Sequence, residues 1–159
     1  MMDAAFLEDF RRTVDTASVR LLVFSEDEAA RRPAPTKWSK KEIIGHLIDS
    51  AANNHGRFVQ AQLQDDLVFP SYDQDDWVKI QKYQHRPWTR LVGLWHTYNH
   101  HIADMMAATD AEALSRVRVV HNLDRIAWKM IHPSQPATLD YFMRDYVAHL
   151  KHHLEQAFR

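Results

Sequence analysis

Histidines gather in two parts of the chain where they could do metal chemistry. His149, His152 and His153 lie within five residues in "DYVAHLKHHLEQ", and His46 lies in the apolar run "KEIIGHLIDS". Imidazole is the commonest metal ligand among side chains and also serves as a general acid or base. The chain has no cysteine, which excludes thiolate ligands and a cysteine nucleophile. Because the sequence contains 11 histidines, their positions on helix faces must decide which of them could share an ion.

The periodicity of the C-terminal segment separates its histidines. Phe142 and Tyr146 belong to an apolar stripe with steps of three and four, and His149 and His153 continue it. His152 lies roughly 100° from His153 around the helix axis and therefore on another face. An i, i+4 pair on one face is close enough to share an ion. The same pair could equally be two histidines at the core edge that bond to backbone groups or water.

His46 begins a polar stripe beside an apolar one. Ile43 and Leu47 mark the core side of its segment. Steps of three, four, seven and eleven from His46 reach polar side chains, namely Asp49, Ser50, Asn53 and Arg57. A bundle tolerates such a stripe only if its groups are hydrogen-bonded or line a cavity. We therefore expect a cleft with His46 at its base.

Two other metal motifs are disfavoured. His96 and His100 are also spaced i, i+4, but they lie roughly 100–140° from the centre of the apolar stripe that contains Trp95 and Ile102. This spacing predicts a solvated face for them. The zinc-protease motif H-E-x-x-H is absent, because Leu150 occupies the position of the glutamate.

Four segments carry the periodicity of amphipathic helices. Ser39 followed by Glu42 predicts a capping box at the start of the second helix. Together the segments predict an all-α four-helix bundle, a single domain over residues 1–159. The expected helices are Asp3–Ser25, Ser39–Asp65, Pro87–Thr109 and Thr138–Ala157. The aromatic residues expected in the core are Trp88, Trp95, Phe142 and Tyr146.

The remaining stretches are connectors. "RRPAPT" and "DDLVFPSYDQDDW" contain prolines that break helices. Between 111 and 136, "RVRVV" is consistent with a short extended piece and "LDRIAWKMI" with a short helix or a strand. Tryptophans 38, 77 and 88 lie at helix starts or in a connector, where some could stay exposed, so we expect a homodimer.

Charge and hydropathy exclude several classes of partner. With 20 basic and 21 acidic residues the net charge is -1, so neither a nucleic acid nor a membrane surface is expected as a partner. No apolar run approaches the roughly 20 residues needed to cross a bilayer. The N-terminal residues do not form a secretory signal, so a cytoplasmic location is expected.

Three stretches, "KWSKKEIIGHLIDSAANNHGRF", "PSYDQDDW" and "HPSQPATLDYFMRDYVAHLKHH", resemble the DinB superfamily and in particular its YfiT-like branch. The likeness covers the chain from Trp38 onward and is weakest over Glu112–Trp128. It implies a four-helix bundle with up-down-down-up order and a divalent metal held by three histidines. In this sequence the ligands fall on His46, His149 and His153.

The resemblance also implies a chemistry. Family members are described as metal-dependent hydrolases or as S-transferases that use low-molecular-weight thiols such as bacillithiol or mycothiol, and their substrates are small molecules. Three imidazoles suit Zn²⁺ or Ni²⁺ and leave positions open for water or a thiolate as the nucleophile. No general base is assigned by the sequence.

Three residues of the second helix have two possible roles each. Asp49 is either a base or a hydrogen-bond partner of a ligand histidine. Asn53 and Arg57 either hold a substrate carboxylate or satisfy one another. Two alternatives to an enzyme remain open: a stress-related bundle that binds a metal or ligand without catalysis, and a structural bundle without metal.

Overall fold

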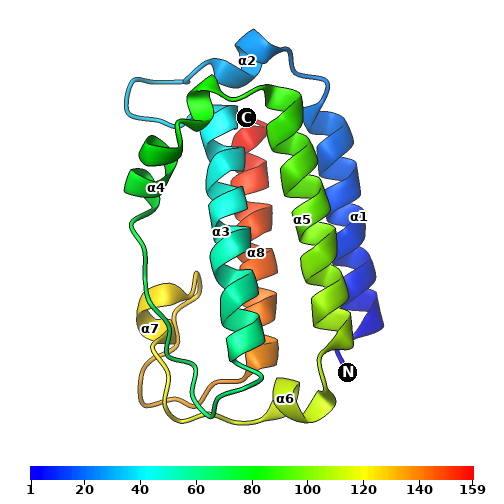
Figure 1. Cartoon of the computed structure of the whole chain (residues 1–159), viewed down its shortest axis with the longest axis vertical. Coiled ribbons are helices and arrows are strands. Elements are labelled where there is room, and N and C mark those ends of the chain that lie inside the picture. Colours follow the sequence, from blue (N-terminus) through cyan, green and yellow to red (C-terminus); the bar gives the residue numbers. More distant parts are fainter.

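Four long helices pack side by side in the computed structural model, which describes residues 1–159 (Figure 1). They are α1 (Ala4–Leu21), α3 (Lys40–Gln60), α5 (Trp88–Ala108) and α8 (Leu139–Ala157). α1 and α8 run in one direction, whereas α3 and α5 run in the other (Figure 1). The expected four-helix bundle with up-down-down-up order is confirmed.

Short helices lie in the connections. α2 (Glu26–Ala30) joins α1 to α3. α4 (Gln74–Gln81) and the 3-10 helix η1 (Tyr83–His85) lie in the long crossover that returns the chain from the end of α3 to the start of α5 (Figure 1). α6 (Ala111–Ser115) and α7 (Leu123–Ile126) precede α8. The crossover that contains α4 and η1 carries the chain back to the start of the bundle, so α3 and α5 can run in the same direction (Figure 1).

Neighbouring residues set the start of α3, whereas a residue far along the chain sets its end. Its start is the predicted capping box, in which the Glu42 N–H donates to the Ser39 hydroxyl (3.2 Å) and the Glu42 carboxylate accepts from the Ser39 N–H (2.9 Å). Its end at Gln60 comes earlier than the predicted Asp65. The buried guanidinium of Arg118 donates to the Ala61 carbonyl (2.7 Å), the acceptor that a longer helix would use.

The connectors differ from the prediction in two places. The crossover contains α4, which begins where the Asp73 carboxylate accepts the Asp76 N–H (2.9 Å). The stretch around Arg118 makes only isolated bridges, to Ala137 and between Leu67 and His121, and no strand forms. "LDRIAWKMI" starts as the short helix α7.

The apolar faces of the long helices meet in one core. Trp88, Trp95, Phe142 and Tyr146 are all buried there, as predicted. The buried Trp88 donates its indole N–H to the Leu21 carbonyl (3.0 Å), so it adds nothing to an exposed apolar surface. None of the helices is both long and apolar enough to span a bilayer.

Candidate metal centre

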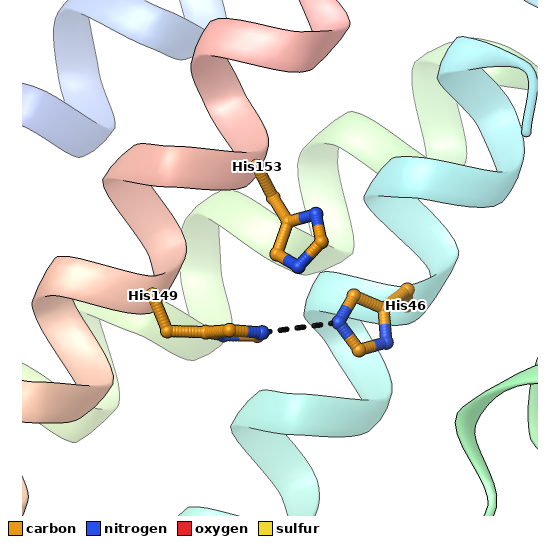
Figure 2. A group of neighbouring side chains, drawn as sticks. All are labelled: His46, His149 and His153. Carbon is orange, nitrogen blue, oxygen red and sulfur yellow. Dashed lines mark hydrogen bonds between the residues drawn. The ribbon is translucent and has the colours of Figure 1, made fainter. Parts of the chain in front are cut away.

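α3 and α8 lie side by side and bring three histidine rings together, His46 from α3 and His149 and His153 from α8 (Figure 2). The Nε2 atoms of His46 and His149 are 3.2 Å apart. The ring of His153 lies 4.6 Å from that of His46 and 4.5 Å from that of His149, centroid to centroid. One ring nitrogen of each residue lies within 4.8 Å of the other two, so the three could hold a metal ion.

Burial keeps these imidazoles neutral. Desolvation, with the neighbouring imidazoles adding to it, lowers the pKa of His46 to about 3 and that of His149 to about 2. Burial also lowers the pKa of His153, although a hydrogen bond with Gln156 (2.8 Å) opposes the shift. Neutral imidazole is the form that binds a metal, so protons do not compete for these nitrogens near pH 7.

The donor set passes a simple test for a transition metal. His46 is only 2% exposed, and its Nε2 is directed at the Nε2 of His149 (Figure 2). A tetrahedral zinc with ligands at about 2.0–2.1 Å separates its donor atoms by roughly 3.3 Å, close to the separation of the His46 and His149 Nε2 atoms. Three neutral nitrogens and no thiolate suit Zn²⁺ or Ni²⁺.

Two indole rings flank the cluster. The Trp38 ring lies 5.0 Å from that of His46, and the Trp128 ring lies 5.6 Å from that of His149. Trp128 is held by Asp145, whose two carboxylate oxygens accept the N–H groups of Trp128 and Lys129 (2.7 Å each). Burial raises the pKa of Asp145, whereas these backbone bonds oppose the shift. Both oxygens of this carboxylate are therefore engaged in positioning the segment that covers the histidines.

A cavity of about 220 Å³ opens beside the cluster, with His46 and His149 in its wall. Polar side chains from α3 and the following connector line it, namely Ser50, Asn54, Arg57 and Tyr72. The predicted cleft beside the polar stripe is therefore present, with His46 in its wall. Burial raises the pKa of Tyr72 to about 12, even though the guanidinium of Arg57 opposes the shift. The hydroxyl of Tyr72 is thus a neutral hydrogen-bonding group.

Of the predicted polar stripe, Ser50 and Arg57 reach this cavity along with His46, and Arg57 is the charged one. It is 6% exposed, and its guanidinium donates to the Pro70 carbonyl (2.6 Å) and to the Asn54 side chain (3.4 Å). No carboxylate lies within ion-pair distance of it, and burial lowers its pKa. A buried positive charge without an acidic partner is costly, which is a mark of a binding group.

Asp49 and Asn53 lie outside this cavity wall. The Asp49 carboxylate accepts from the hydroxyl of Tyr83 (2.6 Å) and from Gln81, and it makes no hydrogen bond to a histidine. Asn53 donates to the Asp49 carbonyl of its own helix (2.9 Å). Viewed along α3, both residues fall on one side of His46, whereas the cavity lies on the other side, where Asn54 takes the place expected for Asn53.

Two residues of the site, Asp145 and Trp128, were not predicted from the sequence. Asp145 lies one helical turn before His149, so its spacing was a usable signal. Trp128 follows a short helix in a stretch without periodicity and gave no signal. His152 lies outside the three-histidine group, as expected, and its ring packs against that of Trp128 at 4.5 Å.

A family model of the DinB superfamily matches residues 9–157. The chain belongs to the DinB superfamily. Among solved structures, YfiT from Bacillus subtilis superposes with a TM-score of 0.71 at 15% sequence identity, covering 97% of this chain and 85% of YfiT. YfiT is described as a probable metal-dependent hydrolase with an unusual four-helix bundle topology. At this identity the likeness establishes the shared fold. A search of curated protein sequences gives no match.

Proposed function

We propose that this DinB-superfamily protein is a metal-dependent enzyme that acts on a small anionic molecule. His46, His149 and His153 would hold the ion, with zinc or nickel as the metals that suit the donor set. The observation that carries the proposal is the convergence of three neutral imidazoles beside a cavity with a buried arginine. The description of YfiT as a probable metal-dependent hydrolase supports it.

The chain's own groups have separate tasks in this proposal. When bound, the ion would supply Lewis-acid chemistry, which lowers the pKa of a water or thiol nucleophile and polarises the bond under attack. Trp38 and Trp128 limit the access of bulk water to the three histidines. Asp145 keeps Trp128 in place through the two backbone hydrogen bonds.

Arg57 defines the substrate class. Its guanidinium lies in the cavity wall without a counterion from the chain, so an anionic substrate group would compensate its charge. The neutral Tyr72 hydroxyl, in the same wall, can donate a hydrogen bond to that anion. A carboxylate is the simplest group that matches this pair.

Two reaction types fit the site: hydrolysis, with water as nucleophile, and S-transfer from a low-molecular-weight thiol such as bacillithiol or mycothiol. Asp145, the carboxylate in the cavity wall, already accepts two backbone N–H bonds, and Asp49 lies outside that wall, so the cavity offers no free carboxylate base. This arrangement favours an acidic nucleophile such as a thiol, because it needs less help from a base. The alternative from another class is a bundle that binds metal and ligand without turnover.

The test combines metal analysis with two activity screens on the full chain. Protein loaded with zinc or nickel is offered carboxylate-bearing esters and amides, and separately a thiol with a fluorogenic alkyl halide. We expect turnover in one screen, its loss in His153→Ala, and its retention in His152→Ala. Stoichiometric metal without turnover in either screen would favour the binding protein, and absence of metal would contradict the proposal.

A homodimer is part of the proposal as well. Among the tryptophans expected at a contact surface, Trp38 is half-buried against the histidines and Trp77 remains exposed. Pairing of two copies through the face that contains Trp77 would cover this ring. Light scattering across a concentration series tests the idea, and a monomer at the highest concentration would contradict it.

A further inference from the structure

A second cluster of metal-binding residues joins α1 to α5. His96 and His100 lie one turn apart on α5, and both direct Nε2 at the same Oδ1 atom of Asp15 on α1, at 2.8 Å and 2.7 Å. The two rings are 4.7 Å apart, centroid to centroid. One potential ligand atom from each residue lies within 4.8 Å of the other two. Two helices therefore present two nitrogens and an oxygen to one point.

The surroundings leave Asp15 available to a cation. Arg11 lies one turn earlier on α1 and is engaged with Asp104 of α5 (2.5 Å). Arg12 is engaged with Asp9 of its own helix (3.0 Å). Neither guanidinium is paired with Asp15. The carboxylate is therefore free to act as a ligand.

We propose that Asp15, His96 and His100 form a second divalent-metal site at the surface of the bundle. The donor set of two imidazoles and one carboxylate suits zinc, nickel or copper(II). Binding needs the proton of each imidazole to move from Nε2 to Nδ1, so that Nε2 can bind the ion. It also needs the Nε2–Oδ1 separations to open from 2.7–2.8 Å to roughly 3.3 Å, the spacing around a tetrahedral ion. Asp15 can make that movement because its side chain is 56% exposed.

The site differs in kind from the three-histidine cluster. The side chains of His96 and His100 are 36% and 30% exposed, so water completes the coordination and can compete for the ion. The ion would tie α1 to α5 and stabilise the fold by mass action, since the two ligand helices separate on unfolding. This inference does not rest on the proposed enzyme activity.

Calorimetric titration of the metal-free full chain with zinc or nickel tests the site. We expect two ions per chain in the wild type, the second bound more weakly than the first. His100→Ala and Asp15→Asn should each weaken the second ion at least about tenfold and leave the first unchanged. His101→Ala is the matched control, because it removes an exposed histidine of the same helix outside the cluster.

A second measurement keeps the test independent of how the first site behaves. Protein preloaded with one equivalent of zinc is heated with and without further zinc. The extra zinc should raise the Tm of the wild type and of His101→Ala, but not that of His100→Ala. A single ion per chain at millimolar zinc, or a second ion unaffected by His100→Ala and Asp15→Asn, would overturn the proposal.

Discussion

The cluster between α3 and α8 and the cluster between α1 and α5 are built from the same local unit. Each has an i, i+4 histidine pair on one helix and a third group from a neighbouring helix (His149 and His153 with His46; His96 and His100 with Asp15). The first is largely buried and uncharged, whereas the second is partly exposed and contains a carboxylate. Spacing alone therefore does not distinguish the two; the helix face does.

The difference in environment predicts a difference in chemistry. An ion between α3 and α8 would keep its full positive charge, because no carboxylate is among the three residues, and it would lie beside a cavity with Arg57. An ion at Asp15 would be partly neutralised and open to water. An ion at the three histidines would therefore be suited to polarise a bound molecule. An ion at Asp15 would instead hold α1 and α5 together.

The largest expected effect is on metal affinity. His149→Ala should weaken the tightly bound ion by more than about 100-fold, since loss of a ligand costs more than loss of a group that merely orients one. His152→Ala should leave that ion in place, because its ring lies outside the group. Zinc titration measures both. Tight binding that survives His149→Ala would reverse the assignment of the two clusters.

Arg57→Gln should weaken the binding of carboxylate ligands to the zinc-loaded protein by about 10–100-fold, the loss of one charged hydrogen bond. The free energy of unfolding should change little, because the guanidinium has no acidic partner to leave behind. Arg125→Gln, an exposed arginine of the same cavity wall, is the control and should have a smaller effect. Competition against a chromophoric carboxylate measures the affinities. An equal loss of carboxylate affinity in both variants would contradict the role proposed for Arg57.

Substitution of two glycines, one near each cluster, tests how tightly the surroundings of the two clusters are packed. A Cβ at Gly45, beside His46 on α3, would collide with the ring of Tyr83, so Gly45→Ala should cost about 1–3 kcal/mol. A Cβ at Gly93, one turn before His96 on α5, meets open space. Gly93→Ala should therefore stabilise the protein by about 0.5–1 kcal/mol. Urea unfolding of the metal-free variants measures both, and a shared sign would contradict the difference in packing.

The last expected effect is on the pH dependence of the metal-free protein. The pKa of His149 is about 2 in the folded chain, far below its ordinary value of about 6.5, so below pH 6.5 only the unfolded chain takes up this proton. Stability must fall as the pH falls, by up to about 1.4 kcal/mol per pH unit for this histidine. His149→Gln should lose less stability than the wild type between pH 6.5 and 5.5. Identical losses in urea unfolding at the two pH values would show that burial does not hold this imidazole neutral.

Much of the site was predictable because it depends on local geometry. Periodicity along one helix fixes the angle of each side chain around the axis, and it correctly put His149 and His153 with Phe142 and Tyr146 on the inward face. The Ser39 capping box was equally local. The solvated face predicted for His96 and His100 is only partly realised, because both rings are half-buried and bonded to Asp15 of the neighbouring α1.

Other features depend on which helix lies opposite. The predicted polar stripe of α3 contained Asn53 and not Asn54, and only the placement of the crossover and of α8 decided that Asn54 lines the cavity. The early end of α3 depends on Arg118, far along the chain. Asp15 meets His96 and His100 across more than 80 positions, a contact that no periodicity encodes.

The sequence by itself determined the four amphipathic helices, the inward pair on α8 and membership of a family, because these are written in local spacing and in the order of short motifs. Tertiary structure decided which groups complete each cluster and which remain unpaired. Rotation and contact between helices depend on the packing of the whole core, and a step of three or four residues describes one helix only. The guanidinium of Arg57, bonded to the Pro70 carbonyl and not to a carboxylate, and the loop held by Asp145 became visible only when distant segments were brought together.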